Sequence, residues 1–63
     1  MKRSELIQYI TKYNCELLRE GAKHSIYYNQ SSKKQTTIPR HSEIADLLCK
    51  IICKQLEIPA IKK

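Results

Sequence analysis

CELLREGAKHSIYYNQSSKKQTTIP, residues 15–39, is the stretch that decides the fold. It contains three short runs with alternating, β-branched or aromatic side chains, separated by two segments of small and polar residues. We expect three strands, at residues 15–19, 23–29 and 34–39. The two reversals between them are expected at Gly21-Ala22 and at residues 30–33. Links this short join neighbouring strands in antiparallel order. The stretch therefore predicts an antiparallel meander whose last strand ends at Pro39, because proline has no amide hydrogen to donate.

The residues before this stretch predict a short amphipathic helix over residues 4–13. Its apolar positions recur with helical spacing, and they are Leu6, Tyr9, Ile10 and Tyr13. We expect Ser4 to be the N-cap and Asn14 to end the helix in the left-handed conformation. Both tyrosines of this helix are then expected in the core.

The residues after it predict a second and more apolar helix. Its apolar positions share one face, and they are Ile44, Leu47, Leu48, Ile51, Ile52 and Leu56. Ser42 is the expected N-cap, with Glu43 and Asp46 in the first turn. Pro59 prevents continuation, so residues 60–63 are expected to fray.

The predicted fold class is α+β, with the element order αβββα. Each helix has one apolar face, so both must cover the same side of the three-stranded antiparallel sheet. This is the layout of a double-stranded-RNA-binding domain. The other side of the sheet is then open to water or to a ligand.

The length of the chain limits the number of domains, and its charge limits the classes of partner that it can bind. The 63 residues suffice for one domain, residues 1–63, and twelve Lys and Arg against six Asp and Glu give a net charge of +6. Such a balance favours a polyanionic partner, which is nucleic acid, an acidic membrane surface or an acidic protein. Neither a signal peptide nor a membrane span is evident, so we expect a cytoplasmic protein.

The three cysteines are expected to stay reduced and to act as small apolar side chains. Cys49 and Cys53 are four residues apart and would share a helix face. Together with Cys15 and a histidine they offer the ligand types of a zinc site. Their spacing inside an apolar helix differs from the usual zinc pairs near turns, and we therefore predict no metal site.

Three motifs, in this order, resemble the HicA family of toxins from toxin–antitoxin modules. They are LLREGAKHSIYYN at residues 17–29, TTIPRHSEI at 36–44 and ICKQLEIP at 52–59. The resemblance implies an endoribonuclease that cuts messenger RNA without a metal or other cofactor and is silenced by a HicB-like antitoxin. It also implies that His24 is the catalytic residue. The chain departs from the family at Gly21-Ala22-Lys23, where glycine is often nearer the histidine, and at Glu57, where glycine is frequent.

The expected chemistry at His24 is proton transfer. Cleavage of RNA without a metal needs a base for the ribose 2′-hydroxyl, and histidine changes its charge most readily near neutral pH. The residues expected to hold phosphates or to stack on bases are Arg19, Lys23, Tyr27, Tyr28, Lys33, Lys34 and Arg40. His24, Ile26 and Tyr28 share one strand face, so His24 would lie at the rim of the core if Ile26 points at the helices.

Other hypotheses stay open at this point. His41 is expected to pack or hydrogen-bond at the start of the second helix rather than to take part in chemistry. One alternative function is a non-catalytic RNA-binding module of the same fold, and another is an interaction domain for an acidic protein. A homodimer is compatible with either.

Overall fold

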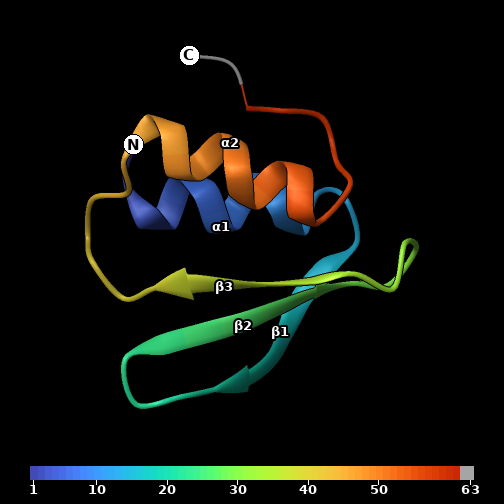
Figure 1. Ribbon diagram of the computed structural model, residues 1–63, viewed down its shortest axis with the longest axis horizontal. Helices are drawn as coiled ribbons and strands as arrows, with labels where there is room; N and C mark the ends of the chain where they lie inside the picture. The colour runs from blue at the N-terminus through green and yellow to red at the C-terminus, as the bar shows by residue number, and fades with distance from the viewer. Residues whose placement is uncertain (62–63) are drawn as a thin grey trace.

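The computed structural model describes residues 1–61 and contains two helices and three strands (Figure 1). In chain order these are α1 (Arg3–Thr11), β1 (Cys15–Glu20), β2 (His24–Asn29), β3 (Gln35–Pro39) and α2 (Asp46–Gln55). The sheet has the order β1-β2-β3, and both neighbouring pairs are antiparallel. The predicted α+β fold with an αβββα order and a double-stranded-RNA-binding-domain layout is therefore confirmed.

The core lies between the two helices and one face of the sheet. Figure 1 shows α1 and α2 together on the same side of the strands. The buried cluster joins Leu6 and Ile10 of α1, Ile38 of β3 and Ile52 of α2, among others. The three cysteines are buried and free, as predicted, and burial is the main cause that raises the pKa of each thiol. They fill the core as uncharged side chains.

Both predicted N-caps are wrong, because the first residues of the chain pair with the segment between β3 and α2. The N-cap positions are held by Lys2 and Ala45, and neither makes a side-chain cap hydrogen bond. The Ser42 carbonyl instead accepts a hydrogen bond from the Arg3 amide at 2.9 Å, and the Ile44 amide donates to the Met1 carbonyl at 2.8 Å. This pairing places Glu43 in an antiparallel bridge with Lys2, and α2 begins only at Asp46.

Two left-handed residues end the helical segments. Asn14 has a φ of 65°, as predicted, and leads directly into β1. Glu57 has a φ of 58° and follows α2. The Ile58 amide donates to the Cys53 carbonyl at 3.0 Å, and the Glu57 amide donates to the Lys54 carbonyl at 3.1 Å. These two bonds are those of a Schellman motif, in which glycine is the usual left-handed residue.

Two expectations about the core differ from the structure. Tyr13 is 39% exposed rather than buried, because α1 ends at Thr11 and Tyr13 no longer follows the helical stripe. Tyr9 is half-buried against the core, as predicted. Ile61 also packs against the core, whereas a frayed end was expected there. Lys62 and Lys63 lie outside the described residues.

A β-bulge in β1 determines which side chains face the helices. The register changes between Leu17 and Arg19, so that Leu17 lies opposite Tyr27 while Arg19 lies opposite Ile26. Leu18 is the extra residue. Directly opposite residues share one face of a sheet, so the bulge turns Arg19 away from the helices.

The alternation of burial in β2 shows that His24 lies on the open face. Ser25 and Asn29 are buried under the helices, whereas His24 is exposed and Ile26 is only half-buried. The supposition that Ile26 points at the helices is therefore wrong. His24 does not lie at the rim of the core, because the polar Ser25 and Asn29 take the core side of this strand.

Candidate active site

Both histidines of the chain line one surface hollow at the edge of the sheet where β2 begins and β3 ends. The hollow has a volume of about 310 Å³ and is lined by Ala22, Lys23, His24, Arg40 and His41, and we call it the two-histidine hollow. His24 is the first residue of β2 and lies opposite Pro39, the last residue of β3. The chain continues from Pro39 into Arg40 and His41, which brings two imidazoles and two cations to the same end of the sheet.

The turn between β1 and β2 presents His24 and depends on Gly21. The Gly21 amide donates to the His24 carbonyl at 2.7 Å, which closes a three-residue turn. A Cβ atom on Gly21 would lie 3.2 Å from that carbonyl oxygen, which is closer than most side chains allow. Glycine is therefore suited to this position by its small size, since its φ is not positive. The reversal predicted at Gly21-Ala22 is confirmed.

A chain of polar contacts on the helix side braces this turn. Arg3 Nη2 donates to the hydroxyl of Ser25 at 2.8 Å, and this buried hydroxyl donates onward to the Glu20 carboxylate. Arg40 Nη2 lies 3.2 Å from Glu20 Oε1 and donates to the Gly21 carbonyl at 2.7 Å. The hydrogen bond from Ser25 is the main cause that lowers the pKa of the Glu20 carboxyl, and Arg40 and Arg3 lower it as well. The carboxylate thus holds Arg40 beside His24.

The bulge accounts for this arrangement. Because Leu18 is the extra residue, Glu20 lies opposite Ser25 on the helix side instead of opposite His24. A regular β1 would place a carboxylate on the open face at this end. The two-histidine hollow is therefore lined by nitrogen-bearing side chains and Ala22, and none of its five described lining residues is a carboxylate.

The structure divides the predicted RNA-binding residues among four places. Lys23 and Arg40 line the two-histidine hollow. Arg19 and Tyr28 lie on the open face of the sheet, where Arg19 is opposite Ile26 and Tyr28 is opposite Glu16.

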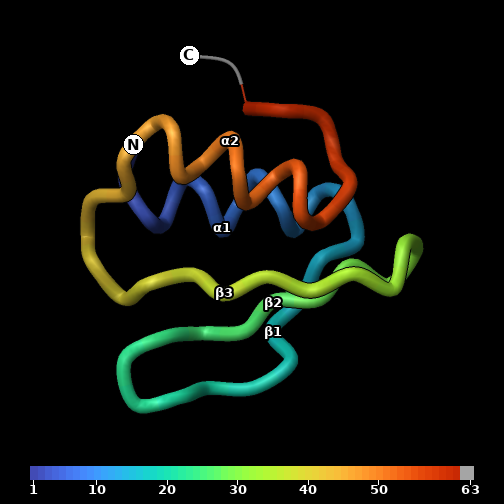
Figure 2. The backbone as a smooth tube through the Cα atoms, in the orientation of Figure 1, coloured from blue at the N-terminus to red at the C-terminus, as the bar shows by residue number. Residues whose placement is uncertain are grey.

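The other predicted RNA-binding residues lie away from His24. Tyr27 is on the helix side of β2 and packs half-buried against the core, so the structure does not bring it together with Tyr28. Lys33 and Lys34 belong to the turn between β2 and β3, where Lys33 has a φ of 66°. Figure 2 shows this turn at the opposite end of the sheet from the turn that precedes His24.

His41 is the site residue whose place the sequence did not indicate. It was expected at the start of α2, but it lies five residues before Asp46 and is exposed in the two-histidine hollow. To predict that His41 lies close to His24, one would need to know that His24 pairs with Pro39 across β2 and β3. The length of the turn at residues 30–34 determines that register, and it cannot be deduced from hydrophobic patterns.

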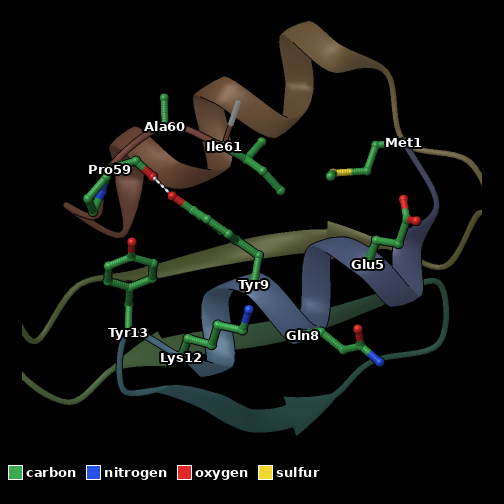
Figure 3. A pocket seen from close by; sticks show the side chains of 9 residues that line it. All are labelled: Met1, Glu5, Gln8, Tyr9, Lys12, Tyr13, Pro59, Ala60 and Ile61. Atoms are coloured by element: carbon green, nitrogen blue, oxygen red, sulfur yellow. Dashed lines mark hydrogen bonds between the residues drawn. The ribbon is translucent and has the colours of Figure 1, made fainter. Parts of the chain in front are cut away.

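A second hollow, of about 580 Å³, lies between α1 and the segment that follows α2 (Figure 3). Tyr9 crosses it and donates a hydrogen bond to the Pro59 carbonyl at 2.6 Å. Burial is the main cause that raises the pKa of Tyr9 to about 12, and Tyr13 adds to the shift. Tyr9 therefore stays neutral and serves to fix the segment that follows α2 on α1. No imidazole is among the nine described residues that line this hollow.

Within residues 1–61, no group of three or more His, Cys, Asp or Glu side chains is arranged to hold a metal ion. In the same part of the chain, neither helix has the length and apolar character needed to cross a membrane.

Comparison with known proteins gives one match. The family described as the HicA toxin of bacterial toxin–antitoxin systems matches residues 3–58, which is nearly the whole chain. Comparisons with curated proteins and with solved structures gave no match.

Proposed function

This chain belongs to the HicA toxin family, and on that premise we propose that it is a metal-independent endoribonuclease that cuts messenger RNA and blocks translation. The observation that carries the proposal is the exposed His24 beside Lys23 and Arg40 in the two-histidine hollow. An imidazole beside two cations, of which Arg40 is held by Glu20 and the Gly21 carbonyl, is suited to promote the attack of a ribose hydroxyl on a phosphate. The cations neutralise the charge that develops on the phosphate oxygens.

In this mechanism His24 takes the proton of the 2′-hydroxyl, and the resulting oxygen attacks the adjacent phosphorus. Lys23 and Arg40 stabilise the negative charge of the pentacoordinate phosphorus. The side chains that line the two-histidine hollow suit this chemistry, because a hard cation such as Mg²⁺ prefers carboxylate and carbonyl oxygens to nitrogen ligands.

The placement of the remaining basic residues supports a path for the RNA along the sheet. Lys33 and Lys34 lie at the far end of β2 from His24. A six-residue strand spans roughly 20 Å, so an RNA strand that contacts both ends must cross the open face. Arg19 and Tyr28 lie on that face. There Arg19 would hold a phosphate and Tyr28 would stack on a base.

We also propose that a HicB-like antitoxin silences the toxin by covering the two-histidine hollow. The same cations that attract RNA would attract acidic side chains of the antitoxin, so steric blocking and competition for the cations act together. An antitoxin that also contacts Lys33 and Lys34 must extend along the sheet, because these residues lie at its opposite end.

The test is incubation of the purified protein with end-labelled messenger RNA in the presence of EDTA. We expect endonucleolytic fragments that carry a 2′,3′-cyclic phosphate or 3′-phosphate end, because the 2′-hydroxyl is the nucleophile. RNA that is bound but stays intact would instead support the non-catalytic RNA-binding module. Cleavage that EDTA abolishes would contradict the metal-independent mechanism.

A further inference from the structure

We propose that His41 is the second proton-transfer residue of the site, which donates a proton to the departing 5′-oxygen while His24 acts as the base. This inference rests on the proposed function. Both histidines of the chain line the same hollow of about 310 Å³, together with Lys23 and Arg40. That volume is at the lower end of ordinary ligand pockets, so groups on its walls are within reach of one phosphodiester.

Arg3 fixes the position of His41 relative to His24. Its backbone amide donates to the Ser42 carbonyl at 2.9 Å, and its Nε donates to the Pro39 carbonyl at 2.9 Å. These two bonds hold the backbone on both sides of the pair Arg40 and His41. The Nη2 atom of the same guanidinium binds the hydroxyl of Ser25, the residue after His24. The half-buried Arg3 thus ties both histidine-bearing segments together, which is the preorganisation that a site with two proton-transfer groups requires.

The proton balance of the step is complete with these two groups. His24, neutral, takes the proton from the 2′-hydroxyl as the bond from the 2′-oxygen to phosphorus forms. The bond from phosphorus to the 5′-oxygen breaks, and that oxygen takes a proton from protonated His41. The products are a 2′,3′-cyclic phosphate and a free 5′-hydroxyl. Exchange of one proton from His24 to water, and of one from water to His41, restores the starting state.

The surroundings of His41 do not point to a structural role for its side chain. The residue is exposed and lies in the segment between β3 and α2. That segment is held by backbone bonds of Ser42 and Ile44 and by the Arg3 side chain. Replacement of the imidazole should therefore leave the fold and the bracing by Arg3 in place.

The experiment compares two substrates that differ only in the leaving atom. One is an RNA with an ordinary linkage at a position that the wild-type protein cuts. The other carries a bridging sulfur in place of the 5′-oxygen at that linkage. A thiol has a pKa of about 8.5 and departs without a proton donor, whereas an alkoxide needs one. The variants are His41→Ala, His24→Ala and, as a control from the same segment, Ser42→Ala, which keeps the carbonyl that Arg3 binds.

We expect His41→Ala to cut the ordinary linkage at least about 100-fold more slowly than the wild type and to cut the sulfur linkage at close to the wild-type rate. His24→Ala should be slow on both substrates, and Ser42→Ala should match the wild type on both. A His41→Ala variant that is folded by circular dichroism and is equally impaired on both substrates, or impaired on neither, would overturn the assignment. A wild-type protein that cuts neither substrate would overturn the proposed function itself, and the role of His41 with it.

Discussion

Replacement of Glu57 by glycine should stabilise the protein, because Glu57 occupies a conformation that glycine adopts at no steric cost. Its φ of 58° places it in the left-handed region, where the Schellman bonds after α2 hold it. In this conformation the Cβ atom of an ordinary residue approaches the following carbonyl oxygen. Glycine is the usual left-handed residue of a Schellman motif, so the change gives α2 the usual helix ending.

The size of the effect follows from two opposing contributions. The left-handed conformation costs a non-glycine residue about 1–2 kcal/mol. Glycine loses more backbone entropy on folding, which offsets about 0.5–1 kcal/mol of that gain. The net increase in the free energy of unfolding should be about 0.5–1 kcal/mol, and for a domain of this size this raises the melting temperature by roughly 2–8 °C.

The assay is thermal unfolding followed by far-ultraviolet circular dichroism, with Glu57→Ala as the matched control. Alanine keeps the steric cost and removes only an exposed carboxylate, so its free energy of unfolding should stay within about 0.5 kcal/mol of the wild type. If Glu57→Gly melts below Glu57→Ala, the left-handed ending of α2 is wrong and so is the reasoning from it.

Three further predictions concern charge. Lys33→Ala combined with Lys34→Ala should weaken RNA binding for all sequences and reduce the slope of log affinity against log salt by about 1.4, and an unchanged slope would show that the β2–β3 turn does not contact the RNA. Reversal of both charges to glutamate should slow association with the antitoxin more than it speeds dissociation in surface plasmon resonance, and an unaltered association rate would place the antitoxin elsewhere. Glu20→Gln should melt below the wild type at pH 7, and the difference should shrink on acidification. The reason is that folding lowers the pKa of the Glu20 carboxyl, so the carboxylate stabilises the fold at pH values above its unfolded-state pKa. This stability is lost as the pH falls through the folded-state pKa. A difference in melting temperature that is constant down to pH 3 would contradict the role of the carboxylate.

Local patterns were sufficient to predict the order and type of all five elements. The alternation and β-propensity of residues 15–39 indicated the meander, and the helical spacing of the apolar residues on either side indicated α1 and α2. Their exact starts were not predictable from such patterns. Ser42 is a good N-cap by type, but its segment pairs with the first residues of the chain, and this tertiary contact prevails over local preference.

The candidate site was predictable only in part, because the pairing register of the strands decides which side chains meet there. His24 could be identified from its motif, while its place on the open face follows from the burial of Ser25 and Asn29, which are polar. The bulge at Leu18 has no signature in the sequence, yet it directs Glu20 to the helix side. The meeting of His24 and His41 depends on the pairing of β2 with β3, which a pattern read along the chain does not reveal.

The central claim is that His24 performs the chemistry, and the most direct measurement is the RNA cleavage rate of His24→Ala alongside its RNA affinity. His24 is exposed, so the variant should keep the circular dichroism spectrum and melting temperature of the wild type. We expect cleavage to fall by at least about 100-fold, the typical contribution of a proton-transfer group, while the affinity for RNA changes little because the cations are intact. A folded His24→Ala protein that cuts RNA at close to the wild-type rate would contradict the account.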